Sequence, residues 1–386
     1  MRLAAGCSIL AFFLGACAST PGTPVAVRPN GSPTHAGTRE PTVLPRTVIT
    51  PGSETDVEQI FAGASEKARA GQPAEAAKGF DRVIELDPNG PLAPQALYES
   101  ALSHEQAGDR EGALQRFEQL ARRFPSHALG REALVRSIRL LCFLERWQRA
   151  GEAADVLLSR FTDLNPFETV VGLSGKALAR VAAGDLDGAI YNVEKGRTVV
   201  EEHGLDAAGA VPRDLAQLYF ALGEVRRIRA EKIKFNPMPP NFPAVLEERC
   251  QLLLDAQSSY SDAMRAYDAH WSAMAGYRVG QLYQQLHRDV MAIPPTGKSD
   301  TLKKKQLFEG AMRLRYRVLL EKGLKMMEGT VRLGKRTGED SAWVHRAEEA
   351  RHDIELAIED EKRALSKLLY TEAELQEALD LLRKKP

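Results

Sequence analysis

The chain has 386 residues, of which 44% are hydrophobic and 27% are charged, and its 52 basic and 52 acidic side chains give zero net charge. This composition agrees with a soluble domain, and the absence of net charge gives no general attraction to nucleic acid. After the first 16 residues, no apolar run approaches the roughly 18 residues that a membrane-spanning helix needs.

Residues 1–16 predict a signal peptide. A basic residue, Arg2, precedes an apolar run over 3–14, and small residues follow that run. The segment is too short for a stable membrane anchor and is typical of secretory signals.

Cys17 marks the predicted cleavage point. The quartet Leu14-Gly15-Ala16-Cys17 resembles the lipobox of bacterial lipoproteins. This resemblance implies cleavage before Cys17 and its acylation, and several acyl chains hold a protein firmly on a membrane. Because Ala18 is not an aspartate, the resemblance implies an outer-membrane lipoprotein that faces the periplasm. Two alternatives stay open: Cys7 as the lipidated residue, and Cys17 as a free cysteine of an ordinary secretory signal.

Residues 17–55 are predicted to form the lipidated cysteine and a disordered tether that follows it. The stretch 18–55 holds seven prolines and four glycines and shows no hydrophobic periodicity. It has too little apolar surface to offset its chain entropy. As a coil its ends would lie about 35 Å apart, which would hold the next domain near a membrane without fixing it there.

One pattern of residues is repeated between 71 and 162. Glycine, alanine, phenylalanine and proline stand at offsets of 0, 5, 9 and 17, and a second copy begins 37 residues after the first. A third copy begins with Glu145 in place of glycine, and a looser fourth begins at Gly184. The two complete copies are Gly71, Ala76, Phe80, Pro88 and Gly108, Ala113, Phe117, Pro125. Such self-similarity predicts an array of helical hairpins, each too small to bury its own apolar face.

Each repeated residue has a structural reason. Glycine permits a left-handed turn between two helices, and Asp109 or Asp185 behind it can cap the next helix. The alanine lets the paired helices approach closely, and the phenylalanine fills the same face one turn later. The proline stops the second helix.

These residues resemble the tetratricopeptide repeat (TPR), specifically over 57–125 and more weakly over 126–200. Leu97 and Ala101 occupy the large and small positions of the family's first helix, whereas Ile138 departs from the small residue expected. The 37-residue spacing is similar to that of a subgroup in bacterial envelope proteins.

Beyond residue 204 the repeat phase is lost, while helical character persists. Helices are predicted over 213–235, 244–290, 301–334, 341–368 and 372–384, the last with a capping box at Thr371 and Glu374. The predicted fold is therefore all-α. An α-solenoid of TPR helical hairpins over 56–204 continues into a less regular helical C-terminal half, with degenerate TPR-like hairpins, over 205–386.

The resemblance also implies a groove lined by the first helix of each hairpin. The family's inward-facing positions fall on two sets of residues: Gln95, Tyr98, Leu102 and Glu105, then Glu132, Val135, Arg139 and Cys142. This mixture suits an extended peptide or a partner helix, and Tyr98, Leu102 and Arg139 are the first candidates for binding energy. Ordinary solvated groove residues are the alternative.

Charge is segregated in the C-terminal half. Residues 298–336 hold twelve basic and four acidic side chains, whereas 339–361 hold nine acidic and two basic ones. The basic segment offers a contact for anionic phospholipid, lipopolysaccharide phosphate or wall polymer. The favoured interpretation is two antiparallel helices that neutralise each other.

Seven aromatic and methionine residues recur at helical spacing. This spacing would place them on one face of a helix, which favours a core role over a partner-binding groove. They are Tyr260, Met264, Tyr267, Trp271, Met274, Tyr277 and Tyr283.

Motifs that carry chemistry are incomplete. Gly297-Lys298-Ser299 resembles the end of a phosphate loop, but Ala292 replaces the required glycine. The histidines show no metal spacing, no serine elbow is present, and Cys142 and Cys250 are expected as buried small residues rather than ligands or a disulfide. We therefore expect no enzyme, no cofactor and no metal.

Together these features predict a non-enzymatic outer-membrane lipoprotein adaptor, whose TPR groove docks protein components of a cell-envelope machine. The resemblance implies β-barrel assembly, secretin assembly or gliding motility as settings. The alternative is a factor that binds or remodels peptidoglycan through 298–336. An enzyme with an unrecognised helical site is a third reading.

Overall fold

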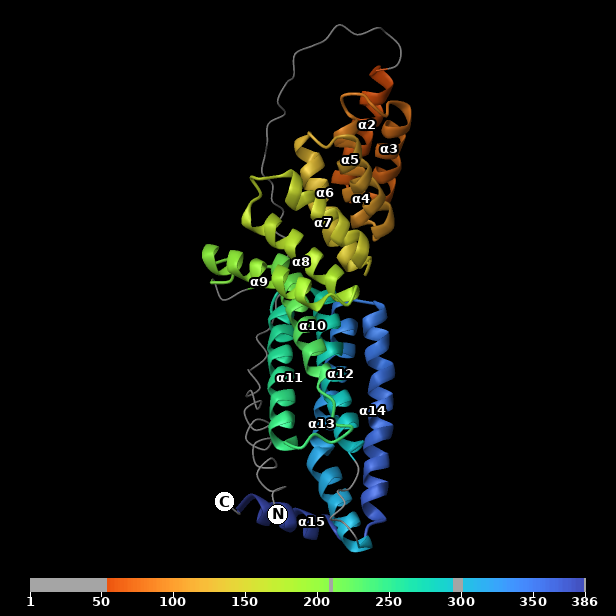
Figure 1. Ribbon diagram of the computed structural model, residues 1–386. Helices are drawn as coiled ribbons and strands as arrows, with labels where there is room; N and C mark the ends of the chain where they lie inside the picture. The colour runs from red at the N-terminus through yellow and green to blue at the C-terminus, as the bar shows by residue number, and fades with distance from the viewer. Residues whose placement is uncertain (1–53, 208–210, 294–300, 385–386) are drawn as a thin grey trace. The chain divides into compact units, whose positions relative to one another are not determined.

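The computed structural model describes residues 54–207, 211–293 and 301–384 (Figure 1). The predicted signal peptide, Cys17, the tether up to residue 53 and the Gly297-Lys298-Ser299 motif lie outside these residues. The described chain is all-α, and those ranges contain no strand. Within them, no helix is both long and apolar enough to cross a bilayer. The chain divides into two compact units, with the boundary between Arg116 and Phe117.

The first unit is described from residue 54. Its helices are α2 (Glu54–Arg69), α3 (Pro73–Leu86), α4 (Ala93–Gln106) and the first half of α5 (Arg110–Arg123). Helix α2 begins two residues before the predicted start of the array. Phe61 meets Phe80 edge-on with ring centroids 5.2 Å apart, and both pack with Ala64 and Ala76 in the core between α2 and α3.

The turns between paired helices follow the sequence pattern. Gly71, Gly108 and Gly184 have φ of +72°, +84° and +77°, in the left-handed region that favours glycine. Glu145, which replaces glycine in the third copy, takes the same conformation with φ of +57°. The four alanines at the close-approach position are fully buried: Ala76, Ala113, Ala150 and Ala189. The predicted helix–turn–helix units are therefore confirmed.

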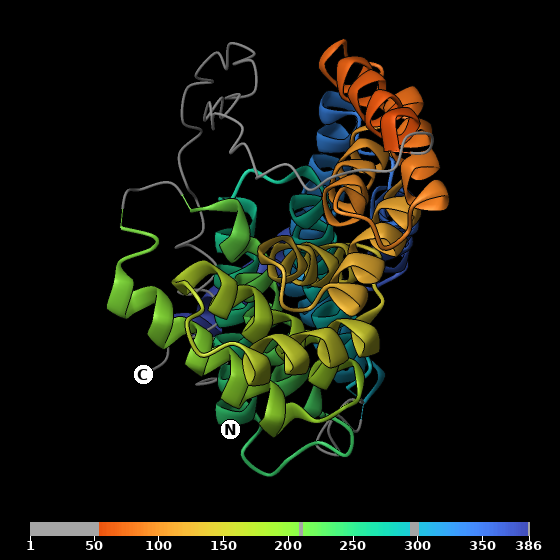
Figure 2. The same ribbon diagram turned by 90° about the horizontal axis from the view of Figure 1, so that it is seen from above.

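The second unit runs from Phe117 and contains the remaining helices. These are α6 (Ala128–Phe143), α7 (Trp147–Arg160), α8 (Pro166–Ala182), α9 (Leu186–His203), the short η1 (Arg213–Leu215), α10 (Ala216–Lys232), α11 (Phe242–Met264), α12 (Ala269–Met291), α13 (Leu302–Thr337), α14 (Ala342–Ser366) and α15 (Glu372–Lys384). Helices α8 and α9 run across the view in Figure 1, whereas α10 to α14 run lengthwise as a bundle. Figure 2 shows α8 and α9 laid over the end of that bundle. Helix α10 packs on both α8 and α9, so no boundary between compact units falls near residue 204.

The single helix predicted over 244–290 is wrong. It is two helices, α11 and α12, separated by a turn in which Tyr267 has φ of +53°. Asp268 then caps α12, because its carboxylate accepts the N–H of Trp271 at 3.0 Å. The seven-residue stripe is consequently divided between two helices. Tyr260 and Met274 are core residues, whereas Tyr267 is 83% exposed at the turn.

The basic helix α13 and the acidic helix α14 pack side by side, as predicted for two helices that neutralise each other's charge. They share an apolar core that includes Leu320, Met327 and Ile354. An ion pair of 2.9 Å joins Arg313 of α13 to Glu361 of α14. The capping box predicted for α15 is also confirmed, because Thr371 and Glu374 exchange hydrogen bonds.

The burial of His287 should make the stability of this bundle depend on pH. His287 on α12 is 6% exposed, and burial lowers the pKa of its imidazole, against the attraction of the Glu361 carboxylate 3.7 Å away. In the unfolded chain the imidazole takes up a proton at about pH 6.5, whereas in the folded chain it does so only at a lower pH. The histidine therefore contributes stability above pH 6.5, and this contribution is lost as pH falls through the folded pKa. We expect the urea midpoint to fall between pH 7 and 5, and His287→Gln to flatten that fall. His345→Gln, at an exposed position on α14, serves as the control, and equal pH slopes for the two variants would contradict this assignment.

Candidate functional site

The predicted groove residues of the first unit lie on one side of α4. Gln95 and Glu105 are exposed, and Tyr98 and Leu102 are half-buried. The opposite side of α4 is buried, with Leu97 at its centre. The spacing of the four predicted residues keeps them on one helix face, and this face stays accessible to a partner.

The equivalent positions on α6 are mostly covered by later parts of the same unit. Val135 is 1% exposed and Cys142 is fully buried, so the surface of this chain offers neither side chain to a partner. Arg139 pairs with Asp214 at 3.0 Å, and Glu132 stays partly exposed beside Arg136. The partner of Arg139, Asp214, belongs to a segment that follows α6 by about 70 residues in the chain.

Two contacts at the C-terminal end of α6 show this covering. The ring of Phe143 stacks on His270 of α12, with centroids 3.7 Å apart. Trp343 of α14 donates its indole N–H to a carboxylate oxygen of Glu145 at 2.8 Å. Helices α12 and α14 therefore both contact this end of the hairpin.

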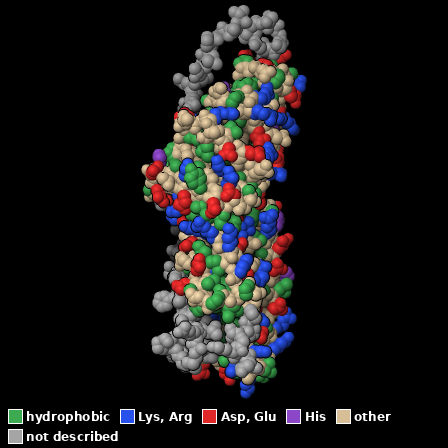
Figure 3. All heavy atoms as spheres, viewed as in Figure 1, with side chains coloured by type: hydrophobic (Ala, Val, Ile, Leu, Met, Phe, Trp, Pro, Cys, Tyr) green, Lys and Arg blue, Asp and Glu red, His purple; other side chains and the backbone are tan. Residues whose placement is uncertain are grey.

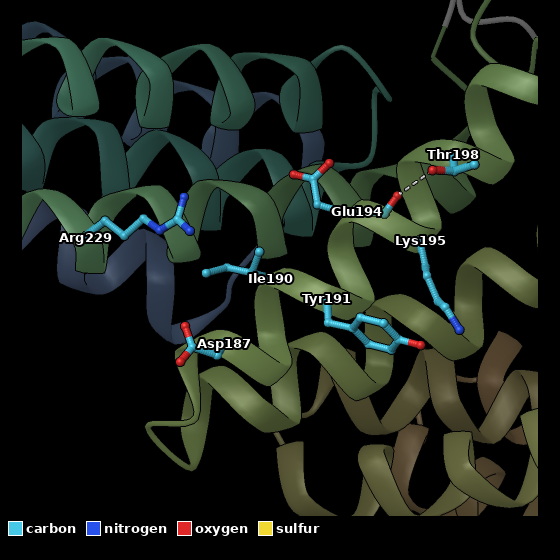
Figure 4. Close-up of a pocket in the computed structure, with 7 residues that line it drawn as sticks. All are labelled: Asp187, Ile190, Tyr191, Glu194, Lys195, Thr198 and Arg229. Atoms are coloured by element: carbon cyan, nitrogen blue, oxygen red, sulfur yellow. Dashed lines mark hydrogen bonds between the residues drawn. The ribbon is translucent and has the colours of Figure 1, made fainter.

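A hollow of about 600 Å³ lies between α9 and α10 (Figure 4). One face of α9 lines it with six residues, Asp187, Ile190, Tyr191, Glu194, Lys195 and Thr198, and α10 contributes Arg229. Tyr191 is 59% exposed, and the ammonium of Lys195 lies 4.6 Å from the centre of its ring. In Figure 4, Arg229 reaches in from the side opposite Tyr191 and Lys195.

Helices α9 and α10 approach closely at Gly196 and leave space nearer the start of α9. At Gly196 the helices are so close that an added Cβ would lie 2.8 Å from a methyl group of Leu218. Nearer the start of α9, only Arg229 of α10 lines the space. Basic side chains gather across the face seen in Figure 3 at the level of α10. The hollow thus combines an exposed aromatic ring with charges of both signs.

A polar cluster beside α4 resembles a catalytic arrangement only in its residue types. The hydroxyl of Ser100 donates to Asp81 at 2.5 Å, and the two ring nitrogens of His104 face Asp81 at 3.2 Å and Asp109 at 2.8 Å. Burial alone would raise the pKa of Asp81, but hydrogen bonds from Arg116 and Ser100 outweigh it and lower that pKa. The serine bonds to a carboxylate of lowered pKa instead of the imidazole, so the cluster lacks the serine–histidine pair that activates a nucleophile. The cluster ties α3, α4 and α5 together.

The two cysteines in the described chain are buried free thiols, as predicted. Burial raises the pKa of Cys142, and raises that of Cys250 to about 12, so neither is a thiolate near neutral pH. Across 54–207, 211–293 and 301–384, no three His, Cys, Asp or Glu side chains converge as metal ligands.

Sequence reasoning missed the hollow on α9. Its signal was present, because the repeat pattern placed Ala189 and Val193 on the buried side of this helix. Tyr191 comes two residues after Ala189, and Lys195 comes two residues after Val193. Two residues are about half a helical turn, so both side chains point away from α8. Arg229, in contrast, has no such signal, because it comes from a helix outside the repeat phase.

The amino-acid sequence matches one protein-family model. The family model described as tetratricopeptide repeat matches residues 95–127. A tetratricopeptide repeat protein from Parabacteroides merdae is 12% identical, covers 76% of this chain and 99% of its own, and has a TM-score of 0.38. The TPR domain of P58(IPK) is 13% identical, with coverages of 78% and 99% and a TM-score of 0.24. No curated protein matches the chain. The chain therefore carries a tetratricopeptide repeat at 95–127, a repeat type that forms scaffolds for protein–protein interaction.

Proposed function

We propose that the chain is a non-enzymatic adaptor that docks protein components of a cell-envelope machine, of the β-barrel assembly, secretin assembly or gliding-motility type. In this proposal an acylated Cys17 holds it on the outer membrane, facing the periplasm. The lipobox-like quartet supports the anchor, and the tetratricopeptide repeat supports the binding of proteins. The alternative, wall binding through 298–336, is less well supported because α13 packs against the acidic α14.

The observation that carries the proposal is the hollow between α9 and α10. A space of about 600 Å³ beside a 59% exposed tyrosine suits an inserted side chain of a partner. Tyrosine and arginine are the residue types that dominate binding energy at interfaces. Tyr191 and Arg229 supply both, and Tyr98 and Leu102 add a second accessible face in the first unit.

In-cell crosslinking tests the proposal. A photo-crosslinking amino acid is placed at Tyr98, at Tyr191 and, as a control, at Leu356, which is 51% exposed on α14. We expect adducts from positions 98 and 191 that mass spectrometry identifies as an envelope barrel, secretin or motility subunit, and none from position 356. If the folded, lipidated protein forms no adduct at either tyrosine, the adaptor function is refuted.

Two exposed tyrosines make a matched pair for a binding measurement. Tyr191→Ala removes the ring beside the hollow, and we expect partner affinity to fall about tenfold, the effect of losing an interface anchor. Tyr267→Ala removes an 83% exposed ring at the α11–α12 turn and should leave affinity unchanged. Each variant should unfold within ~0.5 kcal/mol of the parent, as surface substitutions do. Similar affinity losses in both variants would argue against the hollow.

A further inference from the structure

The hollow between α9 and α10 carries two cations that no carboxylate neutralises by contact. Lys195 and Arg229 are both exposed, and neither makes an ion pair within the part of the chain that the structure describes. Lys195 instead lies over the ring of Tyr191, and Arg229 reaches in from the opposite side (Figure 4). An ammonium and a guanidinium group thus stand on two sides of the same space.

A third cation on α10 adds to the positive potential. Arg226 lies on the turn of α10 that precedes Arg229. Its guanidinium donates to two neutral acceptors, the backbone carbonyl of Asp255 at 2.9 Å and the hydroxyl of Ser259 at 2.7 Å. These hydrogen bonds hold the side chain in place but leave its charge without a counter-ion.

The two acidic residues that line the hollow do not cancel these cations. Glu194 is already paired with Arg197, whose guanidinium lies 3.2 Å away on the next turn of α9. Asp187 lies in the first turn of α9, where the positive end of the helix dipole favours an acidic side chain. The unpaired charge in and beside the hollow is therefore mainly positive, which is complementary to a negative partner.

Apolar surface lies between the two cations of the hollow. Ile190 is half-buried and Tyr191 is 59% exposed, and both line the space between Arg229 and Lys195 in Figure 4. An apolar side chain placed there would leave water, and carboxylates on either side of it would lie nearest the cations. We propose that the hollow binds a partner segment in which an aliphatic or aromatic side chain stands between two acidic residues. This inference rests on the proposed adaptor function and specifies the chemistry of the partner.

Three dye-labelled peptides test the charge preference. Each has a central leucine, and the residues on both sides of that leucine are glutamate in the first peptide, glutamine in the second and lysine in the third. Fluorescence anisotropy measures their binding to the full chain at about 0.05 M and about 0.5 M salt. We expect the glutamate peptide to bind most tightly and the lysine peptide most weakly. The difference should shrink at the higher salt concentration, because screening weakens the ion pairs.

Charge reversal tests whether the preference belongs to the hollow. Lys195→Glu with Arg229→Glu should weaken binding of the glutamate peptide about tenfold, at about threefold for each ion pair lost, and should make the lysine peptide the tighter ligand. Asp187→Asn should strengthen binding of the glutamate peptide about threefold, because it removes an unpaired acid from the lining. The control is Lys325→Glu with Lys335→Glu at exposed positions of α13. It changes the net charge equally and should leave the order of the peptides unchanged.

The results separate this inference from the adaptor function. Equal binding of the three peptides, tighter binding of the lysine peptide to the parent, or equal losses in the reversed and control variants would each overturn the inference. If no peptide binds while the crosslinker at Tyr191 still captures an envelope protein, the acidic segment is refuted and the adaptor function stands. Binding in the expected order with no adduct at Tyr191 or Tyr98 would support the preference of the hollow and refute the adaptor function.

Discussion

Glu224→Ala is expected to lower the free energy of unfolding by about 3–5 kcal/mol, the cost of removing one partner from a buried ion pair. Glu224 on α10 is 4% exposed. Its carboxylate accepts the hydroxyl of Tyr260 at 2.6 Å and pairs with Arg278 and Arg227, each at 2.8 Å. Alanine would remove the shared acceptor of two half-buried guanidinium groups and one buried phenol. Urea unfolding of the full chain, followed by circular dichroism, measures the loss.

Glu231→Ala is the matched control. Glu231 pairs with the same Arg227 at 2.7 Å, but its side chain is 30% exposed. Exposed pairs contribute roughly 0–1 kcal/mol, so this variant should lose no more than that. If the two variants lost equal stability, burial of the Glu224 network would not explain its contribution.

The pH dependence of the Glu224→Ala effect has a definite sign. Burial alone would raise the pKa of Glu224, but the charges of Arg278 and Arg227 outweigh it, so the pKa lies below the ordinary value of 4.5. A lowered carboxyl pKa contributes stability above pH 4.5 that is lost as pH falls through the folded pKa. The difference between the parent and Glu224→Ala should therefore be full near neutral pH and shrink in acid.

Local features of the fold could be predicted from the sequence, because the residues that cause them are neighbours. Gly71 and Gly108 predict left-handed turns, and both residues have positive φ. Asp185 caps α9, because its carboxylate accepts the N–H of Gly188 at 2.9 Å. The helix break at Tyr267 could not be predicted in the same way, since no glycine or proline marks it. A tyrosine with positive φ costs energy that the surrounding packing must offset.

The accessible part of the predicted groove depends on contacts between distant residues. The first-unit positions such as Tyr98 stay accessible, whereas Val135 is buried and Arg139 is engaged by Asp214. Trp343, which covers the end of α6, follows Glu145 by 198 residues. Periodicity within a repeat carries no information about such a partner, so the covered half of the groove could only be seen in the folded chain.

Trp343→Ala is expected to cost about 3–5 kcal/mol, the usual effect of removing a buried aromatic side chain. Trp343 on α14 is 4% exposed. The guanidinium groups of Arg278 and Arg346 lie 5.1 and 4.6 Å from the centre of its ring, and Tyr277 meets the ring edge-on at 5.5 Å. Arg346 is exposed, so Arg346→Ala should cost about 1 kcal/mol or less. Equal losses would contradict a role for the buried ring as the anchor of α14.

The hydrogen bond from Trp343 also explains why a glutamate occupies the turn position that glycine holds in the other repeats. Glycine at 145 would relieve the positive φ, worth about 1 kcal/mol, but would remove the acceptor of the indole N–H. Trp343→Phe keeps the ring and loses only the donor. Glu145→Gly should therefore stabilise the Trp343→Phe variant by about 1 kcal/mol and change the parent little, because strain relief and hydrogen-bond loss cancel there. If Glu145→Gly has the same effect in both backgrounds, the two residues are not coupled and the glutamate is held by other contacts.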